Sequence, residues 1–347
     1  MREQADVPFA ALTTLRVGGP AKRLLVAESD DDVVAVVRQA DRADRPVLVI
    51  GDGSNLLVGA EGFDGDVVKI STSGITVGDH RDDHVVLDVA AGTSWDGVVA
   101  DSVDRGWGGL ETLSGIPGRA GATPVQNVGA YGHEIADVLR SVRVLDRRSG
   151  VVRHLPPDAC GFGYRTSWFK THAQQLVVLG VQLRLTIDGL STPTRYVELA
   201  EALGVEPERR CPVADVRAAV LELRRNKAMV LDPGDHDTWS AGSFFTNPML
   251  DAAAAAALPA DAPRFRQLDG RVKTSAAWLI QRAGFERGYP GAAAPARLST
   301  RHVLALTNRG SATAADLLQL AREVRDGVRR EFAIELEPEP TLVGCSL

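Results

Sequence analysis

Residues 114–132 read SGIPGRAGATPVQNVGAYG, and the prediction of the fold depends most on this stretch. It lies in a glycine-rich run from Gly106 to Gly132, and a loop of that length inside a compact domain usually has a function. Flexible and rigid residues alternate, and the amides of Gln126 and Asn127 accompany many unhindered backbone N–H groups. The stretch therefore suits a ligand that combines a diphosphate with a flat polar ring.

A second glycine-rich stretch, Gly51-Asp52-Gly53-Ser54-Asn55, directly follows the apolar run PVLVI. The run predicts a buried strand, and small residues after it let backbone N–H groups close around a phosphate oxygen. Taken alone, a plain glycine-rich turn is the simpler interpretation. The stretch is not a dinucleotide fingerprint, because Leu56 occupies the third glycine position and no helix pattern begins there.

The elements around these stretches predict an α+β class with no internal repeat. Apolar spacing and end signals predict helices over 30–45, 94–106, 213–228, 252–258, 273–284 and 313–332. Alternating or β-branched runs predict strands over 46–51, 75–76, 85–92, 177–185, 303–308 and 334–344, and a hairpin over 141–155. The composition changes near residue 212, which is the best single domain boundary.

Length and composition set the broad class. A chain of 347 residues is too long for one ordinary core and fits two or three domains. Hydrophobic residues make up 44% and charged residues 24%, so a large core is expected and disorder is not. No apolar run is long enough to span a bilayer, and the N-terminus MREQADVPFAAL lacks a signal layout. We expect a cytoplasmic protein.

Charge, cysteine and histidine patterns exclude several classes of partner. The net charge is −6, from 39 basic and 45 acidic residues, without a run of like charges, so neither nucleic acid nor an anionic membrane is expected to bind. The three cysteines, odd in number and far apart, argue against a disulfide framework and a zinc site. The seven histidines show no ligand spacing, so no metal site is expected.

Three further segments carry candidate chemistry. In GYRTSWFK, residues 163–170, an arginine that suits a bidentate grip on a carboxylate follows a tyrosine, although ordinary surface cations at a strand end explain the segment equally well. Ser243 lies in SAGSFFTNP, where its hydroxyl would be desolvated, but an isolated serine is more simply structural. Glu337 and Glu339 alternate in IELEPEP and are expected to face one side of a strand, where solvated edge carboxylates are the simpler interpretation.

Taken together and in order, these segments resemble one family, the bacterial UDP-N-acetylenolpyruvoylglucosamine reductases of peptidoglycan synthesis. The resemblance runs from about Thr13 to Gly344. It rests on eight motifs: TTLRVGGPA, LVIGDGSNLLV, GLETLSGIPGRAGATPVQNVGAYG, YRTSWFK, RRNKAMVLDP, AGSFFTNP, KTSAAWLIQRAG and LEPEPTLVG. It implies a two-lobed, vanillyl-alcohol-oxidase-like (PCMH-type) FAD-binding domain with lobes at 1–72 and 73–212, followed by an α+β substrate-binding domain at 213–347.

Carried over by position, the resemblance implies three catalytic residues. The family's substrate is an enol ether with a carboxylate, and hydride addition at C3 builds negative charge on C2 and into that carboxylate. Arg165 would bind the carboxylate and stabilise the charge, and Glu339 would order the arginine or share a proton with it. Ser243 would protonate C2 in a site that excludes water.

The resemblance also implies the binding residues. Those for the substrate are Tyr164, Tyr196, Lys227, Asn247 and Arg287, and Tyr196 places the chain with the longer type that carries a tyrosine loop. Those for the cofactor are Gly51, Gly53, Ser54, Asn55, Gly115, Pro117, Gly118, Gln126, Asn127, Gly129, Ala130, Tyr131 and Gly132.

The activity implied is NADPH-dependent reduction of UDP-N-acetylglucosamine enolpyruvate to UDP-N-acetylmuramate through non-covalent FAD. It would serve cell-wall synthesis, and with it cell shape and division, in a protein expected to be a monomer. Another FAD-dependent oxidase or dehydrogenase of the same fold is the alternative enzyme, although no GGH motif for a flavin-linked histidine is present. A non-catalytic nucleotide-binding protein would leave Arg165, Ser243 and Glu339 without a joint role.

Overall fold

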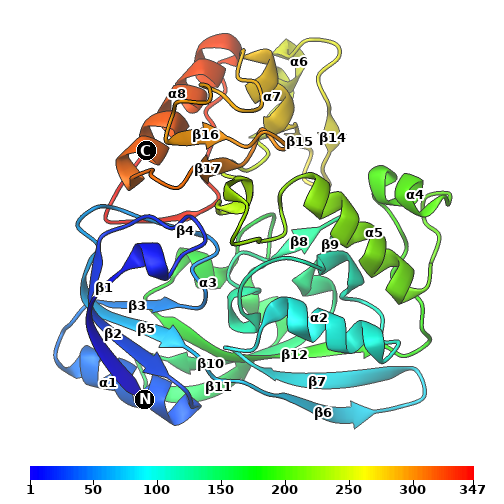
Figure 1. Cartoon of the computed structure of the whole chain (residues 1–347). Coiled ribbons are helices and arrows are strands. Elements are labelled where there is room, and N and C mark those ends of the chain that lie inside the picture. Colours follow the sequence, from blue (N-terminus) through cyan, green and yellow to red (C-terminus); the bar gives the residue numbers. More distant parts are fainter. The chain divides into compact units, whose positions relative to one another are not determined.

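The computed structural model describes all residues, 1–347, and groups them into two compact units (Figure 1). The first unit consists of Met1–Val7, Ala21–Asp52 and Asp64–Val230. The second consists of Pro8–Pro20, Gly53–Phe63 and Leu231–Leu347. This grouping differs from the three predicted ranges, which remain a prediction about domains. Both units mix helices with strands, which confirms the predicted α+β class.

A four-stranded sheet forms one part of the first unit. Its order is β1-β2-β5-β3, with β1 Arg2–Pro8, β2 Pro20–Ala27, β5 Phe63–Ile70 and β3 Val47–Ile50. Helix α1, Asp30–Arg42, begins where the Ser29 hydroxyl accepts the N–H of Asp32 at 3.1 Å. Its buried residues are spaced on one helical face and pack on this sheet: Val33, Val36, Val37 and Ala40.

A five-stranded antiparallel sheet forms the other part of the first unit. Its order is β11-β10-β12-β7-β6, with β11 Val151–Leu155, β10 Leu139–Asp146, β12 Leu176–Thr186, β7 His84–Ala90 and β6 Ile75–His80. Helix α2, Trp95–Asp104, packs beside β7 and β12 through Trp95, Val98 and Val99 (Figure 1). The core cluster that contains the buried residues of α1 also includes Leu145 of β10 and Val177 of β12. The five-stranded sheet also has a core of its own, which includes Val98 and Val99 of α2.

The glycine-rich run 106–132 is mostly irregular, as predicted. It contains only the short 3₁₀ turns η2, Glu111–Leu113, and η3, Ala120–Ala122, and ends in the two-residue strand β8, Gly129–Ala130. That strand pairs with β9, His133–Glu134. The remaining helices of the first unit are α3 Trp168–Thr171, α4 Val197–Leu203 and α5 Val213–Asn226. Helix α5 packs against η2 and α4, so the run is supported from one side by a regular element.

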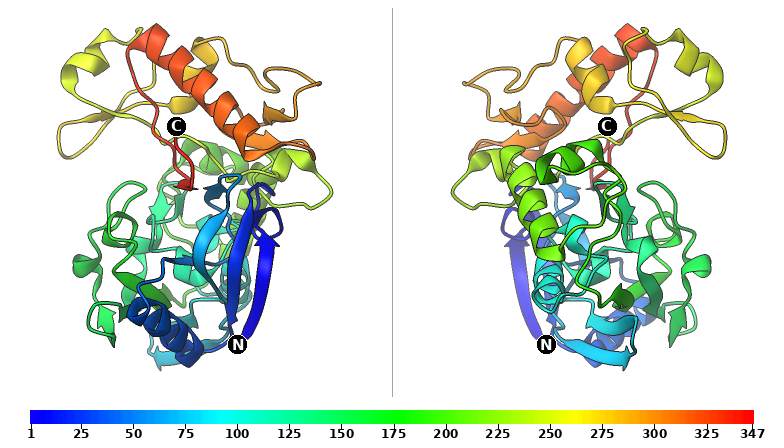
Figure 2. Two further views of the ribbon diagram at one scale, coloured as in Figure 1. Left: turned by 90° about the vertical axis from the view of Figure 1, so that its left-hand side faces the viewer. Right: turned by 90° about the vertical axis from the view of Figure 1, so that its right-hand side faces the viewer.

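The second unit is built around the long helix α8, Ala314–Phe332, the diagonal red and orange helix of Figure 2. It begins with a capping box in which Thr313 and Asp316 exchange hydrogen bonds. Its apolar face packs on α7, Ala276–Arg282, and on the antiparallel pair β16, Ala296–Leu298, and β17, Leu306–Asn308. The other elements are η1 Phe9–Ala11, η6 His236–Thr238, α6 Ala252–Ala257, β13 Met249–Leu250, β14 Phe265–Arg266 and β15 Val272–Lys273.

Two segments from opposite ends of the chain complete the second unit. Strand β4, Leu56–Val58, pairs in parallel with β18, Thr341–Val343. The strand predicted over 334–344 is therefore wrong in its extent, because only its last part is a strand. Pro338 and Pro340 provide no N–H for a ladder, and residues 334–340 run as an irregular segment with one isolated bridge.

The structure was searched for metal sites, disulfides and membrane-spanning helices. No group of three or more histidine, cysteine, aspartate or glutamate side chains is placed to hold a metal ion, and all three cysteines are free. No helix is long and apolar enough to cross a membrane.

Candidate active site

Arg165 lies at the third position of a tight turn in the first unit. Gly163 and Thr166 exchange backbone hydrogen bonds of 3.1 and 3.2 Å across the turn. Arg165 has a φ of +53°, a left-handed conformation that is unfavourable for a non-glycine residue. Its Nη2 donates to the carbonyl of Gly129 at 2.6 Å, and its guanidinium carbon lies 5.5 Å from the centre of the Tyr164 ring. The guanidinium is thus aimed at strand β8.

Ser243 and Glu339 are brought together in the second unit. The N–H of Phe244 donates to the carbonyl of Leu304 at 2.7 Å, and the carbonyl of Phe244 accepts the N–H of Glu339 at 2.9 Å. Phe245 and Pro338 form the isolated bridge beside this bond. Backbone bonds therefore hold together the two segments that carry Ser243 and Glu339, as a preorganised site requires.

The GDGSN stretch contributes to both units. Gly53, Ser54 and Asn55 belong to the second, where Asn55 Nδ2 donates to the carbonyl of Glu339 at 3.3 Å and the Asn55 carbonyl accepts the N–H of Thr341 at 3.0 Å. A side chain at Gly53, where φ is +59°, would meet the carbonyl oxygen of Leu12 at 2.3 Å. Only glycine fits there, so the stretch can present backbone N–H groups close beside Glu339.

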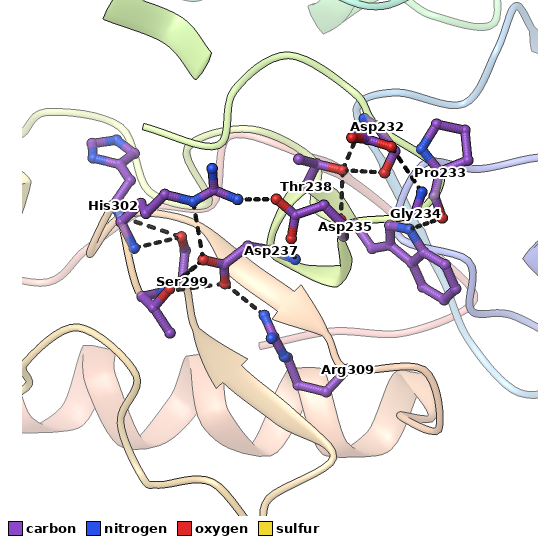
Figure 3. Close-up of polar contacts among 12 residues, drawn as sticks. Asp232, Pro233, Gly234, Asp235, Asp237, Thr238, Ser299, His302 and Arg309 are labelled. Atoms are coloured by element: carbon purple, nitrogen blue, oxygen red, sulfur yellow. Dashed lines mark hydrogen bonds and ion pairs between the residues drawn. The ribbon is translucent and has the colours of Figure 1, made fainter. Parts of the chain in front are cut away.

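The segment that leads to Ser243 is anchored by the buried carboxylate of Asp237 (Figure 3). Asp237 accepts the N–H and hydroxyl of Thr300 and forms ion pairs with Arg309 at 2.5 Å and Arg301 at 3.4 Å. Burial alone would raise the pKa of Asp237, but the hydrogen bonds from Thr300 and the arginine charges outweigh it and lower that pKa.

Two further bonds hold the same segment between Asp237 and Phe244. The N–H of Asn308 in β17 donates to the carbonyl of Trp239 at 3.0 Å. The hydroxyl of Thr14 donates to the carbonyl of Ser240 at 2.7 Å. The chain on the N-terminal side of Ser243 is therefore fixed to β17 and to the N-terminal segment of its own unit.

In the first unit, the loop around Gly115 is held by α2 and α5. Asp96 accepts the N–H of Gly115 at 2.6 Å and forms a bidentate ion pair with Arg217, with N···O distances of 2.7 and 2.9 Å. A side chain at Gly115, where φ is +71°, would meet Leu221 of α5 at 2.9 Å. The backbone of this loop consequently lies against α5 with no room for a Cβ.

Arg224 of α5 lies beside the same loop and has an unsatisfied donor. Its Nη2 donates to the carbonyls of Met229 at 2.7 Å and Gly115 at 3.4 Å, while its Nε is buried without a hydrogen-bond partner in the chain. Burial lowers the pKa of Arg224. A buried unpaired N–H favours a polar or anionic ligand at this place, so the loop and Arg224 fit a flavin nucleotide.

The predicted substrate residues lie in both units. In the first, Lys227 pairs with Glu198 of α4 at 2.5 Å, and Tyr196 packs edge-on against Tyr131 with ring centres 5.6 Å apart. Burial raises the pKa of Tyr131 to about 12, so its hydroxyl stays protonated at neutral pH.

In the second unit, Asn247 Oδ1 accepts the N–H of Ala276 at 2.9 Å at the start of α7, and Arg287 is exposed in the loop after that helix. The remaining predicted cofactor residues of the first unit lie in or beside the irregular run: Gly51, Pro117, Gly118, Gln126, Asn127, Gly129, Ala130, Tyr131 and Gly132. The roles of these residues remain predictions.

Two family models match different parts of the chain. Residues 21–155 match a family model described as an FAD binding domain, and residues 232–343 match the C-terminal domain of UDP-N-acetylenolpyruvoylglucosamine reductase. A reductase of that name from Saccharopolyspora erythraea is 55% identical over 98% of this chain and 95% of that protein. One from Nocardia farcinica is 57% identical over 98% of this chain and 90% of that protein.

The chain belongs to the UDP-N-acetylenolpyruvoylglucosamine reductase family. The crystal structure of a family member from Thermus caldophilus superimposes with a TM-score of 0.65 at 27% identity and covers 99% of both chains. Family membership and the FAD-binding domain confirm the predicted resemblance, the fold and the enzyme class, a flavin-dependent oxidoreductase with FAD as its cofactor.

Sequence reasoning missed three charged residues that support these segments. Arg224 lies one helical turn after the buried Val220 of α5, so helical periodicity could have separated it from the exposed Arg225. Glu198 and Asp237 give no local signal, because their partners Lys227 and Thr300 are distant in the sequence.

Proposed function

We propose that this chain reduces UDP-N-acetylglucosamine enolpyruvate to UDP-N-acetylmuramate with NADPH as the hydride donor. FAD, when bound, would supply the redox chemistry that links oxidation of NADPH to reduction of the enolpyruvyl group at C3. The observation that supports the proposal is the backbone bond from Glu339 to Phe244, the residue after the predicted proton donor Ser243, in a member of this family.

The residues have separate roles in the proposal. Arg165 binds the substrate carboxylate and meets the negative charge that develops on it, an electrostatic contribution of typically 10²- to 10³-fold in rate per donor. Glu339 orients that cation or shares a proton with it. Ser243 gives a proton to C2, which requires a strongly basic carbon and a site without bulk water.

Binding residues are proposed for the rest of the substrate and for FAD. Lys227 and Tyr196 hold the UDP moiety away from the reacting carbons. The backbone around Gly115 and Gly53, together with Arg224, holds FAD without a covalent bond, so denaturation should release the yellow colour into the supernatant. We also propose that the protein is cytoplasmic, acts in cell-wall precursor synthesis and is a monomer. Size-exclusion chromatography tests the oligomeric state.

The deciding experiment is anaerobic. NADPH is added to the yellow protein until the flavin bleaches, and UDP-N-acetylglucosamine enolpyruvate is then added. Return of the yellow colour with formation of UDP-N-acetylmuramate supports the proposal. Bleaching that the substrate does not reverse would contradict it and would favour another FAD-dependent dehydrogenase.

A further inference from the structure

We propose that Asn127 is a positioning residue for Arg165 and not a ligand of FAD. The inference rests on the proposed function, because it assigns the effect of Asn127 to the step in which Arg165 meets the substrate carboxylate. Asn127 and Arg165 both belong to the first unit.

Two segments run side by side at this place, and three side chains join them. The hydroxyl of Ser167 donates to the carbonyl of Val125. Nδ2 of Asn127 donates to the carbonyl of Gly163 at 3.3 Å, and Nη2 of Arg165 donates to the carbonyl of Gly129. These three bonds, to residues 125, 127 and 129, hold the turn that carries Arg165 against the segment that leads into β8.

Both side-chain N–H groups of Asn127 and its amide oxygen have partners within the protein. Besides the bond to Gly163, Nδ2 donates to the carboxylate of Glu134, and Oδ1 accepts the N–H of Ala136 at 3.2 Å. An amide has two N–H donors, and both are taken. The residue is only 1% exposed, so a cofactor would have to displace one of these bonds to reach it.

The bond to Gly163 acts on the strained part of the turn. The carbonyl of Gly163 accepts both the N–H of Thr166, which closes the turn, and Nδ2 of Asn127. Arg165 between them has φ +53°, a conformation that persists only where the surroundings impose it. Without Asn127 the turn loses one of these restraints, and the guanidinium is no longer held at one position.

The test uses two variants of the complete FAD-bound protein. Asn127 itself has φ +48°, so Asn127→Gly removes the amide without straining the backbone. Asn127→Asp keeps the shape and the acceptor for Ala136 but turns the donor toward Gly163 and Glu134 into a repelling oxygen. Asp44→Gly is the control, since Asp44 is exposed and has a similar φ of +51°.

In stopped-flow measurements, both Asn127 variants should retain FAD and be reduced by NADPH within about threefold of wild type, while reoxidation by the enolpyruvyl substrate slows about 10- to 100-fold. In an Arg165→Ala background, Asn127→Gly should change reoxidation by less than about twofold, because the group that it positions is already absent.

Three outcomes would overturn the inference. Loss of FAD affinity in both variants would make Asn127 a cofactor ligand. Slowing that adds in full to that of Arg165→Ala would make its role independent of Arg165, and unaltered reoxidation in both variants would remove it from the reaction. If the wild-type protein itself is not reoxidised by the substrate, the proposed function fails instead.

Discussion

The backbone N–H of Glu339 donates to the carbonyl of Phe244 over 2.9 Å, and this bond joins the two segments that carry the predicted acid and the predicted carboxylate. Because the bond uses only main-chain atoms, the side chains of Ser243 and Glu339 can be replaced without removing it. Variants at these two positions therefore test chemistry more than folding.

The first prediction concerns Ser243. Flavin reduction by NADPH creates no carbanion and needs no proton donor, whereas addition to the enolpyruvyl group creates one. Ser243→Ala should leave bleaching by NADPH within about threefold of wild type and slow reoxidation by the substrate about 10²-fold or more. Ser311→Ala, at an exposed serine of the same unit, is the control. Equal slowing of both phases would mean that Ser243 packs or positions the flavin.

The second prediction separates two neighbouring glutamates. Glu339→Gln keeps the backbone bond to Phe244 but removes the charge, so reoxidation by the substrate should slow about 10²-fold. Glu337 is exposed, and Glu337→Gln should stay within about twofold because a solvated charge contributes little. Rates of reoxidation for both variants check this. Similar losses at the two positions would indicate a general effect of negative charge on this segment.

The sequence predicted the periodic elements well. The helices expected over 30–45 and 313–332 are α1 and α8, since an acidic first turn or a capping residue followed by a regular apolar face specifies a helix locally. The irregular run 106–132 was also predictable, because its glycines and prolines leave few residues for a regular element.

The arrangement of the site was less predictable. The pairing of Phe244 with Glu339 and the parallel pairing of β4 with β18 join residues far apart in the chain, which no local pattern encodes. Asp237 and Arg224 were missed for a related reason. Their importance comes from burial among partners that are distant in sequence, and a lone acidic or basic residue carries no signal of burial.

The third prediction concerns Lys227, which Glu198 holds at 2.5 Å. Lys227→Ala removes a cation that the proposal assigns to the substrate diphosphate, so KM for the UDP substrate should rise about tenfold while bleaching by NADPH is unchanged. Lys22→Ala is the control, because Lys22 is an exposed lysine paired with Asp64 at 2.9 Å. Steady-state kinetics at several substrate concentrations measure the effect. Loss of bound flavin would instead assign Lys227 to the cofactor site.

The fourth prediction tests the unpaired donor of Arg224. If its Nε binds FAD, Arg224→Met should weaken FAD binding roughly 10- to 100-fold, the cost of losing one charged hydrogen bond. Arg225→Met, at the exposed neighbour, should leave the affinity within about twofold. Fluorescence titration of the flavin-free protein with FAD gives both values. A lower melting temperature with unchanged FAD affinity would show that Arg224 only supports the fold.

The last prediction uses the anchor of the Ser243 segment. The folded state lowers the pKa of Asp237, so this carboxylate stabilises the fold above its unfolded pKa of about 3.9, and the stabilisation is lost as the pH falls through the lower folded value. Asp237→Asn leaves Arg309 without its buried counter-ion and should reduce the free energy of unfolding by about 3 kcal/mol at pH 7.

Thermal unfolding from pH 7 down to about pH 3 checks both the size and the sign of this effect, because the difference between wild type and Asp237→Asn should shrink once the pH falls below about 4. Asp269→Asn is the control, since that carboxylate pairs with Arg271 on the exposed surface and its loss should leave the melting temperature nearly unchanged over the same pH range. A difference that stays constant over the whole range would mean that Asp237 contributes through its shape and hydrogen bonds and not through its charge.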